Sequence, residues 1–211
     1  MMKNFKIFLF IMLGLICYNC KDNSETSTQD NSIEGSHLDI DAIKKFIPDG
    51  LKSEKKCKYI NESGTIKEVQ VRYTEEITER ELESESYKSD ELEITLYDEM
   101  DEKFQIVLIG STNYDADYSV VVGLTILYMP ANPTGTILSS IRFDEGGEPI
   151  VNTYDDFRSS ISLNNKTFKD CFVITGTNPD SYSEIYINSE VGVVAFRDKA
   201  NELFVFEEFI N

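Results

Sequence analysis

The chain of 211 residues contains no tryptophan, a single histidine and only four cysteines. The histidine, His37, follows a polar segment with few apolar side chains. Ser-His-Asp and Cys-His arrangements need an imidazole held in a packed site, so we expect no nucleophilic enzyme of these kinds. Zinc sites of the usual types need several His and Cys ligands, so we predict no zinc centre. Phosphate loops, dinucleotide fingerprints and HExxH motifs are also missing.

Basic residues are scarce as well. There are 20 Lys and Arg against 38 Asp and Glu, which gives a formal net charge of −18. Proteins bind nucleic acids by neutralising phosphates with Lys and Arg, so this balance argues against a nucleic-acid partner. Docking to anionic lipid by charge is disfavoured for the same reason. The acidic surface keeps the protein soluble and attracts divalent cations.

After these exclusions, the carboxylates of Asp and Glu are the only catalytic groups that the sequence contains in large number. Glycoside hydrolysis needs just two of them at a set separation, but the sequence singles out no pair. The segment from Asp30 to Asp41 roughly follows a calcium-loop pattern, with oxygen-bearing residues at positions 1, 3, 5 and 12 and Gly35 at position 6. It lacks an entering helix, and Asp41 stands where a bidentate glutamate is usual. We therefore predict no cofactor and keep calcium as an alternative.

The first residues have the pattern of an export signal. Lys3 and Lys6 precede an apolar run over residues 7–16. This run is too short to span a bilayer, which takes about 20 residues as a helix. A charged start followed by a short apolar run is typical of a secretory signal peptide. No A-x-A-like cleavage site follows, which weighs against an ordinary secretory signal.

Cysteines directly after the apolar run make this start resemble a bacterial lipoprotein signal peptide. The resemblance implies that one cysteine is acylated and becomes the first residue of the mature protein. We favour Cys20, because the small polar Asn19 precedes it, over Cys17, which follows the bulky Ile16. The residues after Cys20 are similar to the Cys-Lys-Asp starts of lipoproteins from the Bacteroidota. This implies an outer-membrane or cell-surface location with a lipid anchor.

The last quarter of the chain is similar to the closing strands of many small uncharacterised lipoproteins of the Bacteroidota. The segments that carry this likeness are residues 165–168, 171–174, 185–187, 190–196 and 202–205. Asn165 and Phe204 stand where glycine and tryptophan are usual in such tails. The resemblance implies a sheet-rich end and brings no activity with it.

Periodicity predicts a mainly β domain. Ile40, Ile43 and Ile47 share one helical face, so we expect a short helix over residues 39–47 that Pro48 ends. After a turn at residues 48–50, short apolar segments recur at intervals typical of a sandwich or barrel. We expect about ten strands in an antiparallel β-sandwich or half-barrel. The glutamate-rich stretch at residues 75–91 is interpreted as an exposed loop or an edge strand.

The predicted organisation has three parts, namely a signal peptide at residues 1–19, a flexible tether at residues 20–37 and a single β-rich domain at residues 38–211. The tether is too polar to bury enough surface to offset its ordering entropy. Two cysteines, Cys57 and Cys171, fall inside the domain. Export permits a disulfide between them. A free buried cysteine behaves as a small hydrophobe, so both alternatives stay open.

These observations favour a lipid-anchored envelope protein with a non-catalytic binding or structural domain and a protein or glycan partner. An alternative is a carrier or sensor of a small apolar ligand, which needs an apolar hollow of about 300–1,000 Å³. A carboxylate-based hydrolase is less favoured, and it needs two acids roughly 5–10 Å apart in a cleft.

Overall fold

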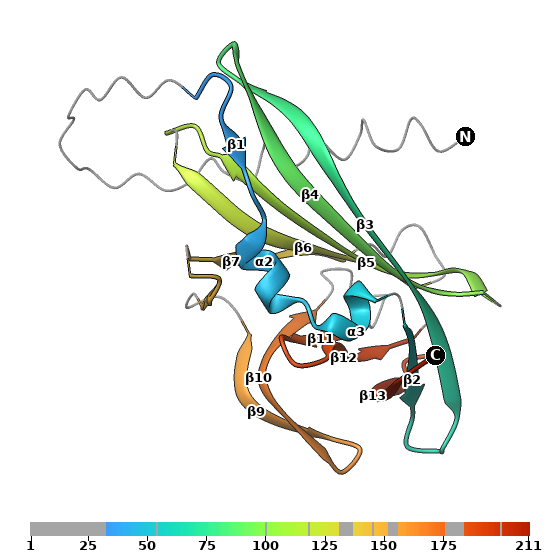
Figure 1. The fold of residues 1–211 in the computed structure, drawn as a ribbon. Coiled ribbons are helices and arrows are strands. Elements are labelled where there is room, and N and C mark those ends of the chain that lie inside the picture. Colours follow the sequence, from blue (N-terminus) through green and yellow to red (C-terminus); the bar gives the residue numbers. More distant parts are fainter. Residues whose placement is uncertain are drawn as a thin grey trace.

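The computed structural model of the chain describes residues 33–53, 55–99, 101–117, 119–130, 137–144, 146–151, 156–175, 184–198 and 200–211. The predicted signal peptide and both candidate acylation sites, Cys17 and Cys20, lie outside the described residues. The described part is mainly β and antiparallel, as expected (Figure 1).

Two short helices and thirteen strands make up the described part of the chain. The helices are α2 (Asp41–Phe46) and α3 (Asp49–Lys52). The strands are β1 (His37–Leu38), β2 (Lys56–Ile60), β3 (Ile66–Leu82), β4 (Glu85–Asp98), β5 (Asp101–Tyr114), β6 (Val120–Pro130), β7 (Ile137–Phe143), β8 (Pro149–Ile150), β9 (Phe157–Leu163), β10 (Lys166–Thr175), β11 (Glu184–Asn188), β12 (Gly192–Arg197) and β13 (Leu203–Ile210).

The strands form one open sheet in the order β8-β7-β6-β5-β4-β3-β2-β13-β12-β11-β10-β9. Strand β3 joins the two halves of this sheet, because residues 66–69 pair with β2 whereas residues 70–82 pair with β4. The C-terminal strand β13 pairs with β2, far from it in sequence. In Figure 1 the helices lie between an upper half, β3 to β8, and a lower half, β2 with β9 to β13.

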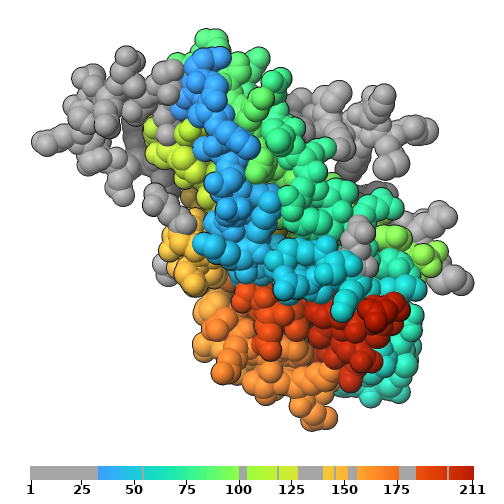
Figure 2. All heavy atoms as spheres, viewed as in Figure 1, coloured from blue at the N-terminus to red at the C-terminus, as the bar shows by residue number. Residues whose placement is uncertain are grey.

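One large apolar core joins the two halves and the helices. It contains Ile43 and Leu51 from the helices, Ile94 from the upper half and Phe196 from the lower half. Helix α2 approaches β5 so closely that a Cβ on Gly110 would lie 2.9 Å from an atom of Ile43. Figure 2 shows the helices, in blue and cyan, running over the boundary between the two halves. The helices therefore pack against both halves of the sheet, inside its curve.

Alternating patterns in the sequence predicted several strands well. Leu92, Ile94 and Leu96 in β4 are all fully buried, as the alternation required. The sequence also predicts a hairpin of residues 191–197 and 203–208 around a turn at residues 198–201, and the pairing of β12 with β13 confirms it. The first hairpin, β2 with β3, is also as expected. Where apolar residues occupy one face of a half-buried strand, the pattern alone is a sufficient signal.

The helical region differs from the prediction of one helix. Helix α2 ends at Phe46. A second short helix, α3, stands where we expected a turn at residues 48–50. The carbonyl of Pro48 accepts hydrogen bonds from the N–H groups of Leu51 and Lys52. Proline is well suited to the start of a helix, so it ends α2 and opens α3. Full burial of Leu51 then holds this turn against the core.

The glutamate-rich stretch forms most of a long hairpin. Of the two alternatives, the edge strand is correct for residues 75–82, which pair with β4 alone, and the loop is wrong. Strands β3 and β4 pair from Gln70–Tyr97 to the tip, where Glu83 and Ser84 have φ values of 50° and 79°. Two positive φ values are typical of the tight turns that match the twist of a hairpin. The described residues form thirteen strands, whereas we predicted about ten. The solvated hairpin of β3 and β4 and the very short strands β1 and β8 account for part of this difference.

Residues 33–37, which the sequence placed in the tether, pack on this hairpin. Ile33 is buried and its N–H donates to Glu85 Oε2 at 2.7 Å. Strand β1 pairs in parallel with β4, so that His37 lies beside Lys88. The backbone N–H groups of Gly35 and Lys88 donate to the carbonyls of Ser86 and Ser36. The chain therefore enters the fold near the tip of the β3–β4 hairpin.

Candidate functional site

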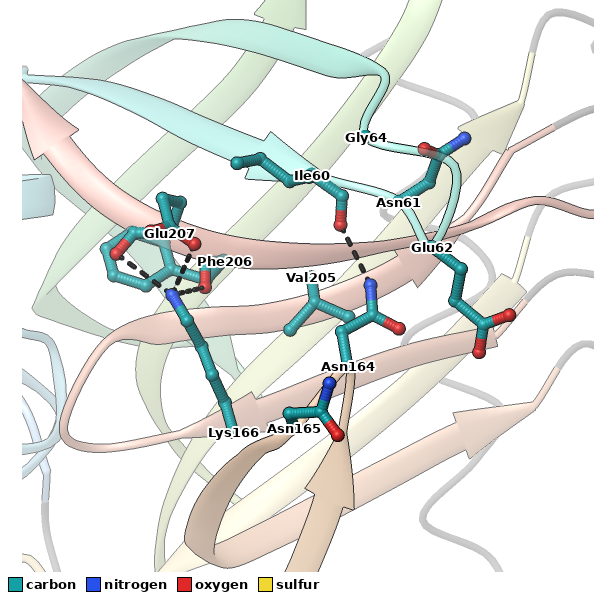
Figure 3. A pocket seen from close by; sticks show the side chains of 10 residues that line it. All are labelled: Ile60, Asn61, Glu62, Gly64, Asn164, Asn165, Lys166, Val205, Phe206 and Glu207. Carbon is teal, nitrogen blue, oxygen red and sulfur yellow. Dashed lines mark hydrogen bonds and ion pairs between the residues drawn. The ribbon is translucent and has the colours of Figure 1, made fainter.

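A polar groove lies where three segments distant in sequence meet. The β2–β3 turn, the β9–β10 turn and the middle of β13 enclose about 530 Å³ (Figure 3). Its lining residues are Ile60, Asn61, Glu62, Gly64, Asn164, Asn165, Lys166, Val205, Phe206 and Glu207. The volume falls within the range of about 300–1,000 Å³ that is usual for ligand sites.

The β2–β3 turn is held by the amide of Asn61. Its Oδ1 accepts hydrogen bonds from the Thr65 N–H and the Ser63 hydroxyl, both at 2.8 Å. Its Nδ2 donates to Glu202 Oε2 at 2.8 Å. Gly64 supplies the positive φ of 84° that the turn requires. All polar atoms of the Asn61 amide therefore serve the turn and the neighbouring β12–β13 connection.

The β9–β10 turn is formed by two asparagines in the left-handed region. Asn164 and Asn165 have φ values of 45° and 62°, which asparagine tolerates better than other side chains. Asn164 Nδ2 donates to the carbonyl of Ile60 at 3.1 Å, so the hairpin tip is attached to β2.

That bond also determines the orientation of the Asn164 amide. Only the NH₂ end of the amide can face the Ile60 carbonyl, so Oδ1 is directed the other way. Asn164 Oδ1 is a buried atom without a hydrogen-bond partner in the described structure. A buried acceptor left unpaired costs about 1–3 kcal/mol. A donor supplied by a ligand would recover that cost.

Lys166 attaches the start of β10 to β13. Its Nζ donates to Glu207 Oε2 at 2.5 Å and to the carbonyl of Phe206 at 3.1 Å. The hydrogen bond and charge of Lys166 lower the pKa of the Glu207 carboxyl. The one cationic side chain of the groove lining is thus neutralised in place.

The groups still free to bind are mainly acceptors. Figure 3 shows the Glu62 carboxylate and the Asn164 amide on one side of the groove, and the Lys166–Glu207 pair on the other. Glu62 and Asn165 are both exposed. The groove therefore presents the Glu62 carboxylate and the adaptable amide of Asn165 to a ligand, with the unpaired Oδ1 of Asn164 buried beside them.

A second hollow of about 430 Å³ lies on the β3–β4 hairpin. It is lined by Thr78, Glu79, Arg80, Glu81 and Tyr87. The guanidinium of Arg80 pairs with Glu91 at 2.8 Å. This hollow belongs to a single hairpin, whereas the groove is assembled from three separate segments.

The two domain cysteines are free and buried. Cys57 lies in the large core, whereas Cys171 belongs to a second cluster with Phe168, Tyr186 and Val205. Of the two alternatives that the sequence left open, the structure has the free thiols. Burial raises the pKa of Cys57 to about 12 and that of Cys171 to about 11, so both stay protonated and unreactive near neutral pH.

The other residues considered in the sequence lie apart from the groove. His37 Nε2 is 2.7 Å from Asp90 Oδ1, at the hairpin end of the molecule. In the candidate calcium loop, Glu34 Oε2 accepts the Ser86 N–H, while Asp30 lies outside the described residues. Among the residues that the structure describes, no group of three or more His, Cys, Asp or Glu is placed to hold a metal ion.

Sequence reasoning identified one of the two turns of the groove. The sequence Asn-Glu-Ser-Gly at residues 61–64 predicts a turn between two strands, whereas Asn165 stands out only as a departure from glycine. An Asn-Asn pair between two apolar segments is a usable hairpin signal. No sequence signal indicates that turns a hundred residues apart would meet.

No helix among the described residues is long and apolar enough to cross a membrane. Comparisons of the chain with protein-family models, with curated proteins and with solved structures found no match.

Proposed function

We propose that this protein is a lipid-anchored lipoprotein of the outer membrane or cell surface whose β domain binds a partner through the polar groove, without catalysis. The observation that carries the binding role is the unpaired, buried Oδ1 of Asn164 at a groove built from three segments. Buried polar groups are nearly always paired in folded proteins, so an exception at a groove suggests a missing ligand. The anchor follows from the resemblance of the start of the chain to a lipoprotein signal.

The placement of the two ends of the domain supports this proposal. The chain enters the fold beside Glu85 and Ser86, at the tip of the β3–β4 hairpin. The β2–β3 and β9–β10 turns lie at the opposite end of the molecule in Figure 1. An acylated Cys20 followed by a tether would span at most roughly 45 Å before Ile33. A lipid at Cys20 would thus hold the end of the domain at the β3–β4 tip within roughly 45 Å of the membrane, and the groove lies at the other end.

Glu207 argues for binding over hydrolysis. A general acid needs a raised pKa, but Lys166 lowers the pKa of Glu207. The second carboxylate of the lining, Glu62, is exposed at a turn. Glu207 thus lacks the raised pKa that the general acid of a carboxylate-based hydrolase needs.

The carrier alternative is less well supported. We describe the open sheet as a half-barrel, because β7 and β10 approach each other across it. Its interior, however, contains packed side chains such as Ile43, Ile94 and Phe196. The two hollows that stand out are lined largely by polar residues, whereas an acyl chain requires an apolar cavity.

Two measurements test the proposal. The intact mass of the native protein, before and after lipase treatment, should correspond to residues 20–211 with acyl chains. A photo-reactive amino acid at the exposed Asn165 should form a discrete adduct in cells. The same probe at the exposed Ile77, on the β3–β4 hairpin, is the matched control. Equal labelling at both positions, or none at Asn165, would contradict a role for the groove.

A further inference from the structure

We infer that the groove receives the guanidinium group of an arginine on a partner protein. This inference rests on the proposed binding role of the groove and names the chemistry of its ligand. It starts from the hydrogen-bonding groups that the groove leaves unused.

Those groups call for a ligand rich in donors. Asn164 Oδ1 has no partner, and the Glu62 carboxylate is exposed beside it in Figure 3. Both are acceptors only. The one charged donor of the lining, Lys166 Nζ, is engaged by Glu207 and the Phe206 carbonyl, and the exposed amide of Asn165 is left as a neutral donor. A ligand with acceptors alone would find no strong donor in the groove.

Among ligands rich in donors, the negative charge around the groove favours a cation. Glu62 and Glu207 line the groove, and Glu202 lies 2.8 Å from the Asn61 amide at its border. Lys166 is compensated by Glu207 at 2.5 Å. The whole chain carries a formal charge of −18, which steers cations toward it and repels anions.

Geometry favours arginine over lysine or a sugar. A guanidinium has five donors in a rigid planar fork, so it can bond to a carboxylate and an amide oxygen together. An ammonium is a compact point charge that matches one acceptor at a time. A sugar would gain from an aromatic platform, but Phe206, the aromatic residue of the lining, is only 7% exposed. Arginine is also enriched at protein interfaces.

The inference is tested by titrating the ¹⁵N-labelled full chain in detergent with N-acetyl-arginine amide, and separately with N-acetyl-lysine amide and methyl glucoside. The arginine amide should shift the side-chain NH₂ signals of Asn164 and Asn165 most. Glu62→Gln should weaken its affinity about two- to fivefold, the range for an exposed ion pair. Glu79→Gln, in the second hollow, is the matched control and should leave the affinity unchanged.

Asn164→Gly is a second probe, because it keeps the left-handed backbone and removes only the amide. It should lower the arginine affinity while the remaining spectrum stays that of the folded chain. If methyl glucoside shifts the same signals and arginine does not, the inference is overturned and the groove remains a binding site. If neither ligand shifts them and the photo-reactive residue at Asn165 forms no adduct, the inference and the proposed function both fail. Equal effects of E62Q and E79Q would also overturn the inference.

Discussion

The buried thiol of Cys57 makes a sharp prediction about stability at alkaline pH. Cys57 is fully buried in the large core, and burial raises its pKa from 9.0 to about 12. The folded state therefore favours the protonated thiol over a range in which the unfolded chain ionises. The contribution of this group is fully present below pH 9 and is lost as the pH rises toward 12.

The magnitude follows from linkage. Each pH unit between the unfolded and folded pKa values lowers the free energy of unfolding by about 1.4 kcal/mol for one group. Raising the pH from 8 to 11 should therefore cost about 2.7 kcal/mol through Cys57 alone. Buried tyrosines such as Tyr59, whose pKa is raised well above 10.0 mainly by desolvation, add to the total loss.

Comparison with Cys57→Ala isolates the contribution of the thiol. The substitution leaves a small cavity, so the variant should unfold with a lower free energy than the wild type at pH 8. This difference in the free energy of unfolding should shrink by about 2.7 kcal/mol at pH 11, because only the wild type loses the contribution of the thiol. Urea unfolding followed by far-UV circular dichroism, under reducing conditions, measures both values. Cys171→Ala is a parallel test, and its deficit should shrink by about 2.3 kcal/mol because the pKa of Cys171 is raised to about 11. An unchanged C57A deficit at pH 11 would refute the burial argument.

Three further predictions concern a buried side chain, a glycine with a positive φ and an ion pair. Leu51→Ala removes a fully buried side chain and should cost about 2–5 kcal/mol in urea unfolding, whereas Ile77→Ala, at a 63% exposed site, should change stability by less than about 0.5 kcal/mol. Gly192→Ala should destabilise by more than about 1 kcal/mol, because φ is 79° and the new Cβ would lie 2.4 Å from Leu51; wild-type thermal stability would contradict this. Lys166→Met should cost under about 1 kcal/mol at this half-exposed pair, yet speed hydrogen exchange at the β9–β10 tip and not in β4.

Local patterns predicted the elements whose residues face the core on one side only. The alternation of Leu92, Ile94 and Leu96 and the spacing of Ile40, Ile43 and Ile47 were sufficient, because burial of one face leaves a period in the sequence. The upper part of the β3–β4 hairpin leaves no such period, because much of it is exposed on both faces. Its tip is instead shaped by the backbone of Glu83 and Ser84.

The groove could not be predicted from sequence patterns, for a different reason. Asn61 and Asn164 are turn residues in the sequence, and each turn is explained locally by positive φ values and side-chain hydrogen bonds. Their meeting depends on the bond from Asn164 to Ile60 and on the contacts of Lys166 with β13. Such long-range contacts form only once the sheet has its strand order and curvature.

The amino-acid sequence by itself determined the β-rich class and the acidic character, and it carries the expectations of a lipid anchor and of no imidazole-based site. These properties depend on composition and on periods of a few residues, which the chain carries whether or not it is folded. Only the tertiary structure decided that Cys57 and Cys171 remain apart, that residues 33–37 join the sheet and that a polar groove forms. These outcomes depend on which distant strands pair, and pairing is decided by the burial of the whole core at once.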